Sequence, residues 1–153
     1  MFIVLEGVDG CGKSTHAKLL GQWLEDEGVC VFLTAEPTKG FLGDALRSFL
    51  SGYQSLDPLS LSLLFCADRM QHLSEEIKPA LSEGKTVVCE RYVHSTIAYQ
   101  AAQGVDWDWL WQLNRFALEP ELVLYLDVDP EVGVERTTTG EVFEKKEFLS
   151  KVR

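Results

Sequence analysis

A glycine-rich segment near the start of the chain ends in a lysine and two hydroxyl residues. It reads Gly7-Val8-Asp9-Gly10-Cys11-Gly12-Lys13-Ser14-Thr15, which matches the pattern G-x-x-x-x-G-K-[ST]. Glycine lets backbone N–H groups curl around phosphate oxygens, lysine adds a positive charge, and a serine hydroxyl can ligate Mg²⁺. The pattern predicts a triphosphate site with Mg²⁺, formed by Gly7, Gly10, Cys11, Gly12, Lys13, Ser14 and Thr15. We expect Lys13 to act on the phosphates and to make no contact with the core.

A carboxylate and a guanidinium stand together at the end of the third apolar run. At the carboxyl edge of a parallel sheet, Glu90 and Arg91 would lie beside the glycine-rich segment. Glu90 could hold Mg²⁺ through water or accept a proton, and Arg91 could bridge donor and acceptor phosphates, which suits phosphoryl transfer. The only asparagine, Asn114, precedes Arg115, so the Asn-Lys-x-Asp element of guanine-specific switches is excluded.

Strand-like and helix-like segments alternate along the chain and would position these groups. Short apolar runs predict buried strands at 2–6, 29–34, 86–90 and 122–127. A period of 3.6 predicts helices over 14–27, 41–52, 58–82, 93–103, 106–118 and 130–138. Asp57-Pro58 and Asp129-Pro130 are expected to begin two of them. This alternation predicts an α/β fold, with a parallel sheet and helices on both of its faces.

Composition and charge limit the partners and the location. The 153 residues fit a single domain, and 24 acidic against 14 basic residues give a formal net charge of -10. Such a surface repels nucleic acid polymers, whereas a few fixed amides and cations in a cleft still attract a small anion. We expect no membrane partner, because no apolar run reaches the roughly 18 residues of a spanning helix. We expect a cytoplasmic location, because the N-terminus has no leader pattern.

The four cysteines are expected to be reduced thiols. No C-x-x-C pair and no histidine at zinc-ligand spacing accompanies them. Cys30, Cys66 and Cys89 stand in apolar runs and are expected to be buried. Cys11 stands at a predicted helix start beside Lys13, which favours the thiolate, so we expect it to be the most reactive thiol.

Four blocks of the sequence resemble the thymidylate kinase family. They are the glycine-rich segment with Asp9, the tripeptide Glu36-Pro37-Thr38, the run Leu64-Phe65-Cys66-Ala67-Asp68-Arg69, and the run from Glu90 to Gln100. With residues 122–130, the resemblance extends over nearly the whole chain. It implies a three-layer P-loop kinase fold with four parallel strands in the order 2-3-1-4. It also implies that a homodimer transfers the γ-phosphoryl group of ATP to dTMP with Mg²⁺.

The resemblance assigns roles to individual residues. It implies catalysis by Asp9, Lys13, Arg91 and Arg136, and Mg²⁺ ligation by Ser14 and Glu90. It implies that dTMP is bound by Asp9, Glu36, Pro37, Arg47, Phe65, Arg69, Arg91, Ser95, Thr96, Tyr99 and Gln100.

Within this set, the base would be recognised from two helices. Phe65 would stack on thymine, and Arg69, one helical turn further on, would reach the edge of the base. Thr96 would hydrogen-bond the base, with Gln100 close by. For the rest of the nucleotide, the resemblance implies that Tyr99 crowds the 2′ position, Arg47 and Arg91 hold the phosphate, and Asp9 contacts the 3′-hydroxyl.

The sequence departs from the family pattern in its transition-state cations. Members supply an arginine from the glycine-rich loop or several from a lid after the fourth strand. Here the loop has Gly10 and Cys11, and the short lid segment, residues 133–146, holds Arg136 alone. An arginine finger is worth about 10³–10⁵ in rate. A catalytically impaired nucleotide-binding protein of the same fold is therefore one alternative. The second alternative is a kinase for another small acceptor, but the presence of Phe65 and Arg69 disfavours it.

Two further departures concern the sheet and its edge. Ala35 stands where the family usually has an arginine, just before Glu36-Pro37. The family's fifth strand is absent from the sequence, so we expect a C-terminally short single domain over residues 1–153 with a four-stranded sheet.

Overall fold

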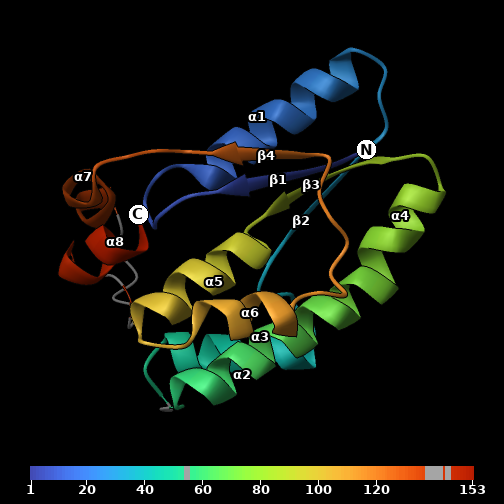
Figure 1. Ribbon diagram of the computed structural model, residues 1–153. Coiled ribbons are helices and arrows are strands. Elements are labelled where there is room, and N and C mark those ends of the chain that lie inside the picture. Colours follow the sequence, from blue (N-terminus) through green and yellow to red (C-terminus); the bar gives the residue numbers. More distant parts are fainter. Residues whose placement is uncertain (54–55, 137–142, 144–145) are drawn as a thin grey trace.

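A parallel sheet of four strands forms the centre of the protein (Figure 1). The computed structural model describes residues 1–53, 56–136, 143 and 146–153. The strands are β1 (Phe2–Glu6), β2 (Val31–Ala35), β3 (Thr86–Glu90) and β4 (Leu122–Tyr125), in the order β2-β3-β1-β4. Val4 of β1 pairs with Cys89 of β3 and with Val123 of β4. The predicted parallel sheet and its strand order are confirmed.

Helices cover both faces of the sheet and complete three layers. α1 (Lys13–Asp26) lies on one face, and α3 (Pro58–His72), α4 (Lys78–Ser82) and α5 (Val93–Ala102) lie on the other (Figure 1). Alternate residues of β1 serve the two layers, since Val4 packs with Ile97 of α5 whereas Ile3 and Leu5 pack with Ala17 of α1. The remaining α-helices of the described chain are α2 (Phe41–Leu50), α6 (Trp107–Leu113), α7 (Pro130–Arg136) and α8 (Lys146–Val152).

The predicted helix over 58–82 is present but contains a π-helical turn. The segment η1 (Leu73–Ile77) separates α3 from α4, and the N–H of Lys78 bonds to the carbonyl of Leu73, five residues earlier. Pro79 gives the physical reason. Its nitrogen has no N–H to continue an α-helical ladder and its ring needs room, which the wider turn provides.

Two predicted helix starts are confirmed by side-chain caps. The carboxylate of Asp57 accepts the N–H groups of Leu59 and Ser60 at 3.0 and 3.1 Å. The carboxylate of Asp129 accepts the N–H of Glu131 at 2.9 Å. These caps fix the first turns of α3 and α7, the helices that carry Arg69 and Arg136.

The strands share one direction, so their carboxyl ends meet at one edge of the sheet. The glycine-rich residues 7–12 connect β1 to α1 at this edge, and α7 and α8 lie beside it (Figure 1). Among the described residues, no helix has both the length and the apolar character that crossing a membrane requires.

Candidate active site

Two cavities meet at the carboxyl edge of the sheet. The inner cavity, of about 280 Å³, is lined by Asp9, Glu36, Pro37, Arg47, Leu50, Phe65, Arg69, Arg91, Tyr92, Ser95, Thr96, Tyr99, Gln100 and Phe143. The loop cavity, of about 600 Å³, is lined by Asp9, Gly10, Cys11, Gly12, Lys13, Ser14, Thr15, His16, Ala35, Glu36, Glu90, Arg91 and Arg136. Asp9, Glu36 and Arg91 belong to both linings, so ligands in the two cavities would meet at these side chains.

The glycine-rich loop depends on backbone conformations that glycine adopts without strain. Gly10 and Gly12 have φ angles of 75° and 92°, in the left-handed region. Gly12 immediately precedes Lys13, the first residue of α1. The unpaired N–H groups and the positive dipole end of this helix therefore lie beside the loop cavity, which favours an anion there.

A close backbone contact holds α7 against this loop. A Cβ added at Gly10 would lie 2.1 Å from the Gly133 carbonyl oxygen, and one added at Gly133 would lie 2.6 Å from the Asp9 carbonyl oxygen. Only glycine allows this approach from both sides. The contact leaves Arg136, at the end of α7, in the lining of the loop cavity.

Lys13 is buried, and the expectation that it makes no contact with the core is wrong, because it contacts the buried residues Val8 and Cys11. Its ammonium donates to the carbonyl oxygens of Gly7 and Val8 at 3.0 and 2.8 Å, and Nζ lies 3.6 Å from Cys11 Sγ. Burial, followed by the nearby positive charge of Arg91, lowers the pKa of Lys13 below its ordinary value. The physical reason for the contact is that the loop folds its own carbonyl groups around the ammonium.

Arg91, which with Asp9 and Glu36 forms the wall shared by the two cavities, is fixed by three side chains. Its guanidinium pairs with the Asp9 carboxylate and donates to Ser95 Oγ at 3.1 Å and to the Tyr99 hydroxyl at 3.3 Å. Burial alone would lower the pKa of Arg91, but Tyr99 and Asp9 raise it overall, so the guanidinium stays charged. Burial alone would raise the pKa of Asp9, but Arg91 and Lys13 lower it overall. The shared wall thus holds a fixed ion pair.

A hydroxyl and a carboxylate of the loop cavity fit a magnesium ion. Ser14 Oγ donates to Glu90 Oε2 at 2.6 Å. Mg²⁺ commonly takes one or two protein oxygens and completes its shell with water and phosphate. Across the described part of the chain, no group of three His, Cys, Asp or Glu residues could hold a metal. Because Mg²⁺ takes few protein ligands, the oxygen pair suits a cation that arrives with a polyphosphate.

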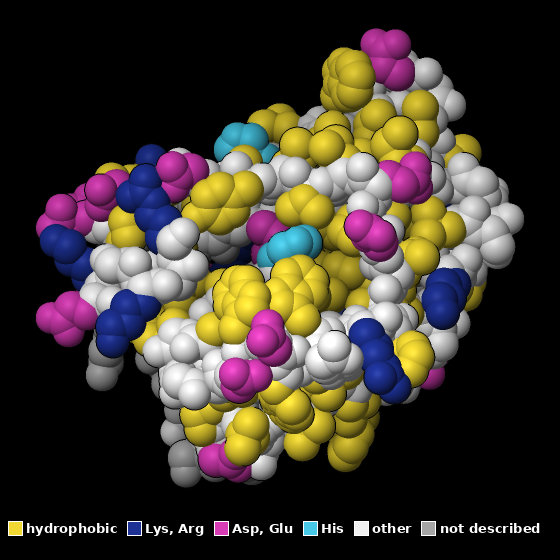
Figure 2. All heavy atoms as spheres, viewed as in Figure 1, with side chains coloured by type: hydrophobic (Ala, Val, Ile, Leu, Met, Phe, Trp, Pro, Cys, Tyr) yellow, Lys and Arg dark blue, Asp and Glu magenta, His cyan; other side chains and the backbone are white. Residues whose placement is uncertain are grey.

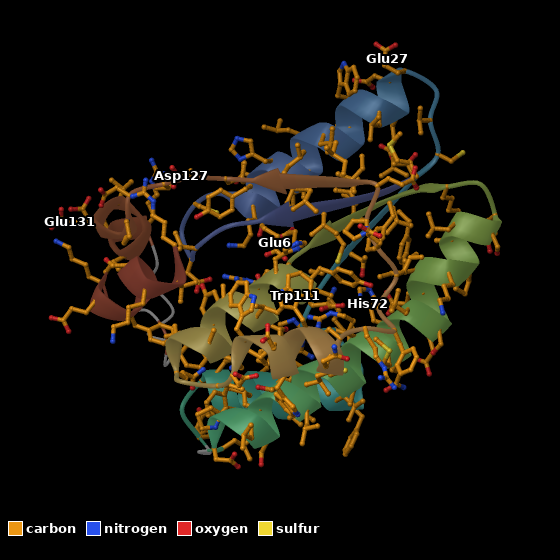
Figure 3. All side chains as sticks on the ribbon, in the orientation of Figure 1. Glu6, Glu27, His72, Trp111, Asp127 and Glu131 are labelled. Carbon is orange, nitrogen blue, oxygen red and sulfur yellow. The ribbon has the colours of Figure 1, made fainter. Side chains whose placement is uncertain are left out.

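Arg69 lies in a buried hydrogen-bonded cluster beside the inner cavity. Its Nε and Nη2 donate to Glu36 Oε2 at 2.9 and 2.7 Å, and further bonds go to Asn114 Oδ1 at 2.6 Å and Thr96 Oγ1 at 2.9 Å. His72 Nδ1 lies 3.2 Å from the other oxygen of Glu36, beneath the sheet (Figure 3). These bonds use four of the five guanidinium N–H groups, so among the described residues one N–H on Nη1 has no hydrogen-bond partner.

Gln100 lines the inner cavity with an amide that is fully buried. Neither its Oε1 nor its Nε2 has a partner among the described residues. An unpaired buried amide destabilises the protein by about 1–3 kcal/mol, so this side chain indicates a polar ligand. The half-buried ring of Phe65 lines the same cavity. An aromatic face and an amide with both a donor and an acceptor suit a planar heterocycle.

Comparison with known proteins identifies the family. The sequence model of the family described as Thymidylate kinase matches residues 5–153. The chain belongs to the thymidylate kinase family. A probable thymidylate kinase of Pyrococcus horikoshii is 48% identical over 140 residues, covering 88% of this chain and 68% of the relative. A probable thymidylate kinase of Methanocaldococcus jannaschii is 44% identical over 156 residues, covering 100% of this chain and 78% of the relative. One of Thermococcus kodakarensis is 46% identical over 156 residues, covering 97% of this chain and 75% of the relative.

The cavities bring together the residues that the resemblance to thymidylate kinases singled out. Every residue predicted to bind the acceptor lines the inner cavity, including Arg47, which is half-buried and donates to the Pro37 carbonyl at 3.2 Å. The predicted triphosphate residues line the loop cavity, except Gly7, whose carbonyl accepts from Lys13. The roles of these acceptor-binding and triphosphate-binding residues stay predictions.

Sequence reasoning missed several members of both linings. These are Leu50, Tyr92 and Phe143 in the inner cavity, and His16 and Ala35 in the loop cavity. Phe143 falls in the predicted thymidylate kinase lid, residues 133–146, and its ring centroid lies 5.7 Å from that of Tyr99 and 5.0 Å from that of Phe148. The sequence signal that could have identified Phe143 is that it is an aromatic residue within a polar segment. Residues 137–142 and 144–145 of the predicted lid lie outside the described residues.

The expectation that Cys30 is buried is wrong, and the predicted high reactivity of Cys11 stays a prediction. Cys30 is exposed, whereas Cys11, Cys66 and Cys89 are buried. Cys30 precedes the edge strand β2, where neither layer of helices covers it, and Cys11 lies under the ammonium of Lys13. Burial raises the pKa of the Cys66 and Cys89 thiols. The most accessible thiol of this thymidylate kinase family member is therefore Cys30 and not Cys11.

Proposed function

We propose that this chain transfers the γ-phosphoryl group of ATP to dTMP, giving dTDP and ADP. Membership of the thymidylate kinase family supports this reaction. The observation that carries it at the site is the shared wall of Asp9, Glu36 and Arg91 between the two cavities. An acceptor phosphate and a donor triphosphate would meet at one guanidinium there. That is the arrangement direct transfer needs, because positioning supplies most of phosphoryl-transfer catalysis.

We propose that dTMP binds in the inner cavity. Phe65 would stack on thymine, while the unpaired amide of Gln100, the free N–H of Arg69 and the Thr96 hydroxyl would face its polar edge. In the same lining, Arg47 and Arg91 would hold the phosphate, Tyr99 would crowd the 2′ position and Asp9 would contact the 3′-hydroxyl.

ATP would bind in the loop cavity, with its phosphates on the backbone of residues 10–15 and on Lys13. Ser14 and Glu90 would hold Mg²⁺, which supplies neutralising charge to the phosphates when bound. On binding, Lys13 would exchange its bonds to the Gly7 and Val8 carbonyls for bonds to the phosphate chain. Burial lowers the pKa of Lys13 in the nucleotide-free protein. An anionic phosphate beside the ammonium would raise this pKa and so favour the charged form.

During transfer, an oxygen of the dTMP phosphate would bond to the γ-phosphorus as the bond to the ADP oxygen breaks. Arg91 would neutralise both phosphates because its guanidinium lines both cavities. Arg136, which α7 holds in the lining of the loop cavity, would add a second positive charge there. Asp9 would orient Arg91 and Tyr99 through the bonds it already makes to them.

The experiment that tests the proposal is ADP release from ATP and Mg²⁺ with dTMP, dUMP, dCMP or dGMP as acceptor. We expect rapid release with dTMP and slower release with the others, and ATP alone gives the background. Release at background with every acceptor would favour a catalytically impaired nucleotide-binding protein. Faster release with another monophosphate would favour a kinase for a different acceptor. The family membership of the chain favours neither alternative.

We also propose that the enzyme forms a homodimer. Exposed apolar side chains stand one turn apart on two helices, Leu59 and Leu63 on α3 and Trp107 and Trp111 on α6. Figure 2 shows hydrophobic side chains gathered over the α6 region. Sedimentation velocity should give the mass of two chains, and Trp111→Glu should shift it to that of one. A single-chain mass for the unmodified protein at micromolar concentration would contradict the proposal.

A further inference from the structure

A carboxylate from the central strand caps the helix that follows Arg91. Glu6, the last residue of β1, is 4% exposed and lies between the sheet and α5 (Figure 3). Its Oε1 accepts the backbone N–H groups of Tyr92 and Ser95 at 2.9 and 3.1 Å. Tyr92 is the N-cap residue of α5 and supplies no side-chain cap of its own. Glu6 therefore satisfies two of the free N–H groups at this helix start.

The same carboxylate sets the direction of a hydrogen bond to Arg91. Ser95 Oγ donates its proton to Glu6 Oε2. A serine hydroxyl has one proton and two lone pairs, so Ser95 Oγ is left as an acceptor on its other side. Arg91 Nη1 donates to that oxygen at 3.1 Å. The chain of bonds runs from Glu6 through Ser95 to the guanidinium that lines both cavities.

Glu6 also holds the backbone around a strained residue. Arg91 has a φ of 63°, in the left-handed region, which is uncommon for a residue with a side chain. Its N–H bonds to the Leu5 carbonyl at 2.9 Å, and the next N–H, of Tyr92, bonds to Glu6. Two consecutive residues of β1 therefore fix two consecutive amides at the turn that aims Arg91.

We propose that Glu6 is a positioning residue for phosphoryl transfer, acting through Ser95 and the start of α5 on the guanidinium of Arg91. This inference rests on the proposed function. Glu6 is in the lining of neither the inner nor the loop cavity, so it acts without touching either substrate. Its negative charge also faces Arg91 and supports the charged guanidinium.

The test is a double-mutant cycle with Glu6→Gln, Ser95→Ala and the double variant. Glutamine keeps an oxygen for the two backbone N–H groups but places an NH₂ opposite Ser95 Oγ, which turns the serine proton toward Arg91. We expect Glu6→Gln to lower kcat by about tenfold, within the range of coupled neighbours, with little change in the KM for ATP. The double variant should lose no more than the worse single variant. Losses that simply multiply would overturn the proposal, as would full activity of Glu6→Gln.

A matched control removes a helix cap away from the site. Asp106 caps α6 by accepting the N–H of Trp109 at 2.7 Å, and it lines neither cavity. Asp106→Ala should lower thermal stability and leave kcat unchanged, so an effect of Glu6→Gln on kcat is not a general loss of stability.

A second readout keeps this proposal separate from the proposed function. Absence of turnover in the unmodified protein would contradict the function alone. The ¹⁵N–¹H side-chain NMR signal of Arg91 in the nucleotide-free protein should shift in Glu6→Gln and in Ser95→Ala, and stay in place in Asp106→Ala. An unshifted Arg91 signal in Glu6→Gln would overturn the positioning role whatever the turnover.

Discussion

Replacing Lys13 by methionine is expected to reduce kcat by about 10³-fold, the size of effect seen when one charge-stabilising donor is removed from an active site. Methionine keeps the length and apolar character of the side chain but cannot neutralise the phosphates. The fold should survive. The Gly7 and Val8 carbonyls lose a donor, but the folded protein no longer has to bury an ammonium whose pKa burial lowers. Turnover by ADP release and the melting temperature by calorimetry check both parts.

Lys18 provides the matched control, because it lies on the same helix but is exposed to solvent. Lys18→Met should leave both kcat and the melting temperature unchanged. A Lys13→Met variant that turns over dTMP at the normal rate would contradict the phosphate role of the loop. A variant that fails to fold would instead show that the ammonium holds the loop together.

Most of the fold could be predicted because its central strands are buried on both faces. β1 and β3 are short apolar runs without alternation, and their predicted bounds are the observed ones. The edge strands of the described sheet were less well defined. β2 begins at Val31 instead of residue 29, and β4 ends at Tyr125 instead of residue 127. Their residues are partly exposed, so hydrophobicity alone does not mark where hydrogen bonding starts or stops.

The two cavities differ in how far local sequence determines them. One continuous segment, residues 9–16, supplies most of the lining of the loop cavity, so the glycine-rich pattern was sufficient to predict that part of it. The inner cavity draws on distant segments, and only the resemblance to a known family could assemble it. Residues that act through others were missed for the same reason. Glu6 reaches Ser95 across 89 positions, and His72 reaches Glu36 across 36.

Close approaches between backbones were also beyond sequence reasoning. Gly133 stands in a helical pattern, where glycine is only a weak helix former. The structure explains this glycine, because a side chain at position 133 would prevent α7 from approaching the loop at Asp9 and Gly10. The burial of Lys13 is a similar case, because the carbonyl groups that surround its ammonium are oriented by the turn of the loop and not by residue type.

Replacing Arg69 by alanine is expected to raise the KM for dTMP by about tenfold or more, as loss of a charged hydrogen bond does, with a much smaller change in the KM for ATP. The reason is geometric, since Arg69 lines the inner cavity and not the loop cavity. The variant should also be less stable by about 3–5 kcal/mol, because it leaves the Glu36 carboxylate buried without its guanidinium. Steady-state kinetics with each substrate varied, together with urea unfolding, measures both effects.

Arg69→Lys separates recognition of the base from stability. Lysine keeps a positive charge beside Glu36 but lacks the planar group that also reaches Thr96 and Asn114. It should therefore retain more stability than alanine while still raising the KM for dTMP. Arg115→Ala is the control, because Arg115 lies over the ring of Phe116 and lines neither cavity. Equal increases in both KM values for Arg69→Lys would mean that Arg69 only supports the structure, and the base would then have to be recognised by Thr96 and Gln100.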